Sequence, residues 1–153
     1  RSDSPIKTMA QLAGRTLLTP DASSVTSWLT RATLAEAFPA GQPGPTLRAV
    51  RFQDAVRLAV ENKMSDAGVT ASAAEVKEWQ AAGHTVLATS RAAPVKLVLA
   101  HKRLESQSEA LRSWFESQSD LGKIGVTEGF VGFDEAVVLK IWEWLRRGAP
   151  TAA

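Results

Sequence analysis

The sequence RTLLTPDASSVTSWL, residues 15–29, decides the fold, because a short apolar run ends at a proline and then opens into a helix. Arg15–Thr19 has the composition of a buried strand, and Pro20 and Asp21 break it. Hydroxyl residues follow, and apolar residues at helical spacing then predict a helix over Val25–Phe38. A strand followed directly by a helix is typical of an α/β fold.

The start of this predicted helix has the groups of an anion site. A helix N-terminus leaves backbone N–H groups without partners and carries the positive end of the macrodipole. Ser and Thr hydroxyls placed there can surround a phosphate-like oxyanion. The same residues are also ordinary N-caps, so spacing alone leaves both interpretations open.

Strand-like and helix-like segments alternate through most of the chain. The predicted strands are Arg15–Thr19, Leu47–Phe52, Asp66–Val69, Thr85–Thr89 and Val95–His101, and the predicted helices between them are Val25–Phe38, Gln53–Asn62 and Ala73–Ala82. Ser72 and Glu75 form a capping-box pattern, and Gly83 lies where a helix C-cap is expected. This order predicts a mainly parallel sheet flanked by helices.

Beyond His101 the pattern becomes helical. We predict helices over Glu105–Ser119 and Asp134–Arg147, joined by a glycine-rich connector. Trp142 and Trp144 lie on roughly opposite faces of the second of these helices. One of them is therefore expected to be packed, and the other to be exposed or to meet a partner.

Composition excludes several classes of function. The chain has 153 residues, 44% of them hydrophobic and 22% charged, which suits a folded globular protein. It has no cysteine, and its net charge is only +2 with dispersed basic residues, so disulfides, thiolate metal sites and a nucleic-acid surface are not expected. No apolar run reaches the length of a membrane span.

The sequence has no motif typical of catalysis or metal binding. His84 and His101 have no partner at metal-ligand spacing, and no nucleophile motif, P-loop or zinc signature is present. We therefore predict no enzyme, cofactor or metal.

Several segments together carry a family resemblance. They are DSPIKTMAQLAGRTLLTPDASSVTSWL, AVRFQDAVRLAVENKMSDAGVT, HTVLATSRAAPVKLVLAHKRL and GVTEGFVGFDE, and they span about Asp3 to Asp134. The chain resembles the phosphonate, phosphite and phosphate group of periplasmic solute-binding proteins. That resemblance implies the type II periplasmic-binding fold, in which two α/β lobes surround a cleft, and delivery of the ligand to an ABC importer.

The resemblance also implies how the chain is organised. Residues 5–94 would form the second, ligand-binding lobe, 95–102 a strand returning through the hinge, 103–148 the C-terminal helices and 149–153 a tail. The hinge itself would be Arg91–Lys96. The first lobe is expected to lie outside this chain, and the protein is expected to be periplasmic or extracytoplasmic and to meet an ABC permease or a receptor.

In this family the hydroxyl turn reads roughly Asp-Pro-x-Ser-Thr-Ser-Gly, and its hydroxyls and amides hold the phosphonate oxygens. The resemblance places Ser24, Val25 and Thr26 at the three hydroxyl positions, with Ser23 before them and Ser27 at the glycine. Val25 removes one donor, a loss of about 1.5 to 3 kcal/mol for a hydrogen bond to a charged group. Ser27 either crowds the ligand or supplies the lost donor. Trp28 follows at the family's aromatic position and either walls the cleft or packs in the core.

Other candidate contacts lie on two later loops. Gln53 opens a helix at the C-terminal end of a strand, the usual ligand edge of an open α/β sheet. After Asp66–Val69 the family offers an acidic or amide side chain, whereas this sequence has Thr70, Ala71 and Ser72, which argues against an aminoalkylphosphonate ligand. Ser72 has the alternative role of a helix cap.

Two functions follow from these residues. The first is a non-catalytic module that binds a small oxyanion of the phosphate, phosphite or phosphonate class for uptake. The second is an extracytoplasmic sensory or protein-interaction domain that keeps the fold but has lost tight ligand binding. Val25 and Thr70 motivate the second, because each reduces the polar contacts available to an anion.

Overall fold

The computed structural model describes residues 1–93, 98–119, 121 and 129–149. The chain forms two compact units, Arg1–Ala93 with Ile141–Ala153, and Pro94–Lys140.

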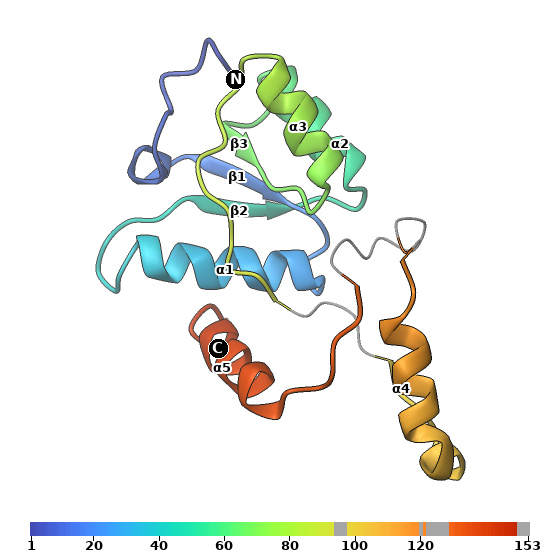
Figure 1. Cartoon of the computed structure of the whole chain (residues 1–153). Coiled ribbons are helices and arrows are strands. Elements are labelled where there is room, and N and C mark those ends of the chain that lie inside the picture. The colour runs from blue at the N-terminus through green and yellow to red at the C-terminus, as the bar shows by residue number, and fades with distance from the viewer. Residues whose placement is uncertain (94–97, 120, 122–128, 150–153) are drawn as a thin grey trace. The chain divides into compact units, whose positions relative to one another are not determined.

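The first unit is built on a three-stranded parallel sheet in the order β2-β1-β3 (Figure 1). Its strands are β1 (Thr16–Thr19), β2 (Thr46–Ala49) and β3 (Ala67–Gly68). A short 3₁₀ helix, η1 (Met9–Leu12), precedes them, and the α-helices of this lobe are α1 (Val25–Ala37), α2 (Asp54–Glu61) and α3 (Ala73–Ala81). The predicted α/β class with a parallel sheet flanked by helices is therefore confirmed.

Helices α1 and α2 cover opposite faces of the sheet. Leu17 is in register with Ala67, and both belong to a buried cluster with Leu34 of α1. The next pair, Leu18 and Gly68, faces the other way because strand side chains alternate. On that face a Cβ atom at Gly68 would lie 2.4 Å from a methyl carbon of Val56 and 3.0 Å from one of Val60, both on α2. Glycine is therefore what lets α2 lie this close to β3.

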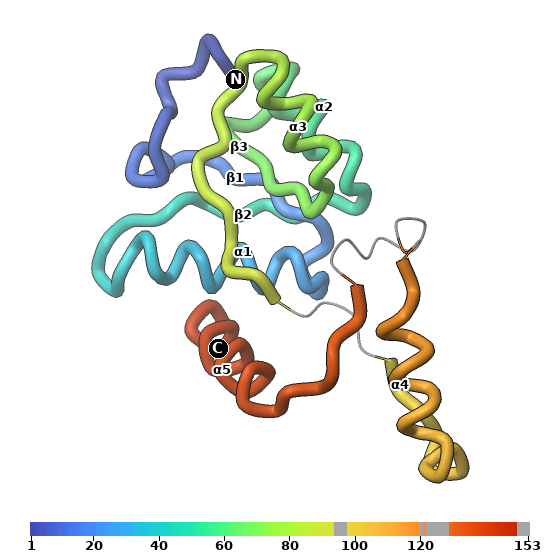
Figure 2. The backbone as a smooth tube through the Cα atoms, in the orientation of Figure 1, coloured from blue at the N-terminus to red at the C-terminus, as the bar shows by residue number. Residues whose placement is uncertain are grey.

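All four strands predicted in the first unit differ from the structure. β1 begins at Thr16 rather than Arg15, and β3 covers only Ala67–Gly68 of the predicted Asp66–Val69. β2 ends at Ala49 rather than Phe52. The Val50 N–H still donates to the Thr19 carbonyl at 2.9 Å, but β1 ends at Thr19 and offers no strand residue beyond it to pair with. The predicted strand Thr85–Thr89 does not form. This segment passes across the sheet instead of running beside a strand (Figure 2), and Leu87 packs against the core cluster.

The predicted strand Val95–His101 is also not found where the structure describes it. Residues 95–97 lie outside the described residues, as does part of the predicted hinge, and Val98–His101 form no strand. A strand needs a neighbour for its backbone groups, and none pairs with this segment in the described part of the chain.

The second unit is helical in its described residues. A 3₁₀ turn, η2 (Lys102–Gln107), leads into α4 (Ser108–Glu116), and Phe115 makes edge-to-face contacts with Trp114 and Phe130. The predicted helix Glu105–Ser119 is therefore shorter as an α-helix, because its first residues form the tighter 3₁₀ turn.

The last helix, α5 (Glu135–Arg146), begins in the second unit and ends in the first. Asp134 caps it by accepting hydrogen bonds from the backbone N–H groups of Ala136 and Val137 at 2.9 and 3.2 Å. Trp144 is 3% exposed, with the Arg91 guanidinium carbon 5.4 Å from its ring, whereas Trp142 is 51% exposed. The prediction that these two tryptophans differ in burial is confirmed. No helix in the described parts of the chain is long and apolar enough to cross a membrane.

Candidate functional site

The candidate site lies along the carboxyl edge, defined here as the edge of the sheet at which β1, β2 and β3 all end. Parallel strands bring their following loops together at this edge, where open α/β sheets bind ligands. Each predicted ligand contact lies on one of these loops or in the helix turn that follows it. They are Ser23, Ser24, Val25, Thr26, Ser27 and Trp28 after β1, Gln53 after β2, and Thr70 and Ser72 after β3.

The hydroxyl turn, Asp21–Ser27, is held by hydrogen bonds of its own. Ser24 is the N-cap of α1, and its Oγ accepts the backbone N–H of Ser27 at 3.1 Å. The Asp21 carboxylate accepts the hydroxyl of Ser23 at 2.5 Å and the backbone N–H of Ser23 at 2.8 Å. The hydrogen bonds from the Ser23 hydroxyl and then its N–H lower the pKa of Asp21. The turn therefore carries an ionised carboxylate at neutral pH.

Ser27 is buried beneath this turn. It is 1% exposed, and its Oγ lies 2.9 Å from the carbonyl oxygen of Pro20, 2.8 Å from that of Asp21 and 3.1 Å from Ser24 Oγ. A single hydroxyl proton serves the two carbonyls. The Ser27 side chain is thus engaged within the turn and ties the end of β1 to the first turn of α1.

Two backbone donors stay open at the start of α1. Among the described residues, none accepts a hydrogen bond from the N–H of Val25 or of Thr26. These are the first two N–H groups of a 13-residue helix, at the positive end of its dipole. Arg31 adds a cation nearby, because its Nη1 lies 3.3 Å from the carbonyl oxygen of Ala22.

The loops after β2 and β3 meet at Thr70. Its hydroxyl accepts from Gln53 Nε2 at 3.2 Å and from the Ser72 backbone N–H at 3.0 Å, and it donates to the Glu75 carboxylate. Ser72 caps α3, since its Oγ accepts the N–H of Glu75 at 3.2 Å. The capping role of Ser72 is confirmed, but the Glu75 carboxylate goes to Thr70 rather than back to the Ser72 N–H.

Sequence reasoning missed Arg31 and Glu75 at this edge. Arg31 lies one helical turn beyond Ser27 on the same face of α1, a spacing that was visible in the sequence. The sequence pattern indicates only a capping role for Glu75, and the fold shows that its carboxylate meets the hydroxyl of Thr70.

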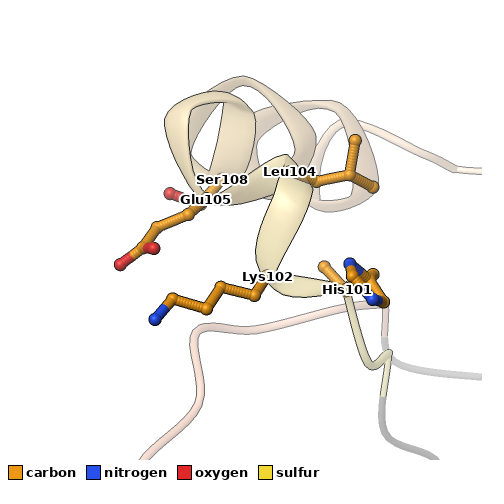
Figure 3. A pocket seen from close by; sticks show the side chains of 6 residues that line it. His101, Lys102, Leu104, Glu105 and Ser108 are labelled. Atoms are coloured by element: carbon orange, nitrogen blue, oxygen red, sulfur yellow. The ribbon is translucent and has the colours of Figure 1, made fainter.

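A separate hollow occurs in the second unit, around the start of η2 (Figure 3). Its lining comes from consecutive turns of one segment, with the Lys102 and Glu105 side chains extending to the same side and Leu104 pointing away. None of the predicted ligand contacts lines it. The hollow is therefore not part of the carboxyl edge.

A comparison with protein families matches residues 1–135 to the model for the periplasmic substrate-binding protein of phosphonate ABC transporters. Comparisons with curated proteins and with solved structures gave no match. The matched region contains the whole sheet and every loop of the carboxyl edge. This family binds and delivers solutes and is not an enzyme family. The chain therefore belongs to the phosphonate-type periplasmic substrate-binding proteins of ABC transporters.

Proposed function

We propose that this chain binds a small oxyanion of the phosphate, phosphite or phosphonate class and serves its uptake through an ABC permease. The observation that carries the proposal is the pair of open N–H groups of Val25 and Thr26 at the start of α1. They lie at the carboxyl edge of β1, where a helix dipole favours negative charge.

The residues of the hydroxyl turn divide into two roles. Thr26 and the backbone of Val25 contact the anion. Ser23 and Ser24 lie beside it, with their hydroxyl protons directed to Asp21 and Ser27 in the ligand-free turn. Asp21 and Ser27 hold the loop in shape through the hydrogen bonds described above. Arg31 supplies positive charge that offsets the ionised Asp21. The proposed function is binding and release of the anion without chemical change.

Valine at position 25 sets the expected affinity. It keeps the backbone N–H and loses one hydroxyl donor, and a lost hydrogen bond to a charged group costs about 1.5 to 3 kcal/mol. That corresponds to about a 10- to 150-fold weaker affinity than a turn with all three hydroxyls.

The test is a titration of the ¹⁵N-labelled chain with phosphate, phosphite, methylphosphonate and sulfate. We expect the amide signals of Val25 and Thr26 to shift for at least one phosphorus oxyanion. Absence of shifts with all four anions would reject the proposal and favour the sensory or protein-interaction alternative.

A proline substitution removes one proposed donor without breaking the helix. Val25 is the first helical residue, where proline is tolerated, and Ser24 before it has the extended backbone that proline requires, with φ of −68° and ψ of 150°. Val25→Pro should therefore weaken anion binding by about tenfold with little change in stability. Ala73→Pro is the matched control, because Ala73 is the first residue of α3 and follows the extended Ser72. Equal affinities of the two variants would contradict the assignment.

A further inference from the structure

The hydroxyl of Thr70 has no capacity left for a ligand. A threonine hydroxyl can donate one hydrogen bond and accept two. Gln53 Nε2 and the Ser72 backbone N–H, at 3.2 and 3.0 Å, occupy both acceptor positions. The single proton goes to Glu75, because an ionised carboxylate can only accept.

This saturation fixes the orientation of the Gln53 side-chain amide. Because Thr70 donates to Glu75, Gln53 can face it only with its NH₂ group. The Gln53 side chain makes no cap bond to α2, and its carbonyl oxygen has no partner among the described residues. A free acceptor, Gln53 Oε1, is therefore held at the same sheet edge as the hydroxyl turn.

We infer that Thr70 is a positioning residue, and that through Gln53 it selects a ligand that brings a hydrogen-bond donor. The selectivity rests on the proposed oxyanion function. Hydrogen phosphate and hydroxyl-bearing phosphonates carry a suitable proton at neutral pH, whereas sulfate carries none. Sulfate has no proton to donate to Gln53 Oε1 and would leave this oxygen without a hydrogen bond. A site that is built to accept a hydrogen bond from its ligand binds an analogue without the donor more weakly. The Glu75 carboxylate beside Thr70 disfavours a ligand without a donor in the same way.

The hydrogen bonds of Thr70 are not the only connection between α2 and α3. Arg57 of α2 bridges Glu78 of α3, with Nη1 2.5 Å from Oε2, and also pairs with Glu61 at 2.9 Å. Loss of the Thr70 hydroxyl therefore releases the Gln53 amide while this second connection between the helices persists.

Thr70→Val and Thr70→Ser separate positioning from packing. Valine keeps the branched shape without the hydroxyl, and serine keeps the hydroxyl. In the ligand-free protein, the hydrogen-bonded N–H of the Gln53 side chain should resonate away from its position in a free glutamine amide, both in the parent and in Thr70→Ser. In Thr70→Val this signal should move to the position of a free glutamine amide.

The second measurement is the ratio of phosphate to sulfate affinity by calorimetry. We expect phosphate to be preferred by at least about tenfold in the parent and in Thr70→Ser, and this preference to fall to about one in Thr70→Val. An unchanged ratio in Thr70→Val would overturn the selectivity, and unchanged Gln53 signals would overturn the positioning role. If no anion binds to any of the three proteins, the selectivity falls with the proposed function, while the Gln53 signals still decide the positioning role.

Discussion

Replacing Ser27 by alanine tests whether this residue stabilises the hydroxyl turn. The Ser27 hydroxyl is almost completely buried and is the group that reaches the carbonyl oxygens of Pro20 and Asp21. In Ser27→Ala the carbonyl of Pro20 stays buried but loses the hydrogen bond from the Ser27 hydroxyl. The backbone N–H groups of Val25 and Thr26 are unchanged by the substitution.

The cost follows from that lost hydrogen bond. Leaving a buried carbonyl unpaired costs about 1 to 3 kcal/mol, and the better helix propensity of alanine returns about 0.5 kcal/mol. We therefore expect Ser27→Ala to lower the free energy of unfolding by about 0.5 to 2.5 kcal/mol. With a urea slope of about 2 kcal/mol per molar, the unfolding midpoint falls by about 0.3 to 1.3 M.

Urea unfolding followed by far-ultraviolet circular dichroism measures this change. Ser23→Ala is the matched control, because Ser23 is exposed and its hydroxyl contacts only the Asp21 carboxylate in the described structure. The control should lie within about 0.5 kcal/mol of the parent. Equal midpoints for Ser27→Ala and Ser23→Ala would refute the structural role of Ser27.

Two other changes test the fold. Gly68→Ala should destabilise the lobe by about 1 to 3 kcal/mol in the same urea assay, because the new Cβ would meet Val56 at 2.4 Å and force α2 away from β3. Asp3 pairs with Arg1 and Lys63, and hydrogen bonds from Lys63 and then Arg1 lower its pKa to about 2. A depressed carboxyl pKa gives stability that is present above the unfolded value and is lost as the pH falls, here between about pH 4 and 2. Asp3→Asn should therefore lose less stability than the parent over that interval in acid titrations of unfolding, and parallel curves would contradict the pairing.

Local patterns in the sequence were enough to predict most of the first unit. The strand ending at Pro20, the cap at Ser24 and the helix after it depend on neighbouring residues only. The same holds for Gly83, which ends α3 with the positive φ of +77° that favours glycine. Such features were predictable because the residues that decide them lie within a few positions of one another.

The prediction of a strand at Thr85–Thr89 is wrong because strand formation there depends on residues far away in the sequence. Its Val, Leu and Thr residues favour extended backbone, but a strand also needs a partner far away in the sequence. β3 has only two residues, and the Thr85 carbonyl accepts the Trp79 indole N–H at 3.1 Å instead. The residue types of this segment predict its extended backbone. They do not predict that it crosses the sheet or that Leu87 packs against the core cluster.

In the candidate site too, some features can be predicted from the sequence pattern and others depend on contacts between distant residues. Its place at the carboxyl edge follows from the alternation of strands and helices, which the sequence reveals. The contact among Gln53, Thr70 and Glu75 joins three elements and depends on how closely α2 and α3 approach. The sequence pattern offered Thr70 as a ligand contact, whereas its saturated hydroxyl supports a positioning role.

Val25 and Ser27, the two residues that differ from the family's hydroxyl turn, affect different properties. Val25 affects the free energy of anion binding, and Ser27 affects the stability of the loop. Val25 removes a side-chain donor from the surface that would face an anion, and its own side chain is 51% exposed. Ser27, in place of glycine, points its hydroxyl inward and joins α1 to the end of β1. The loss at position 25 thus lowers the expected affinity, and the gain at position 27 raises the expected stability of the loop. A preorganised loop loses less entropy when it binds, so we expect the serine to offset part of the affinity that the valine costs.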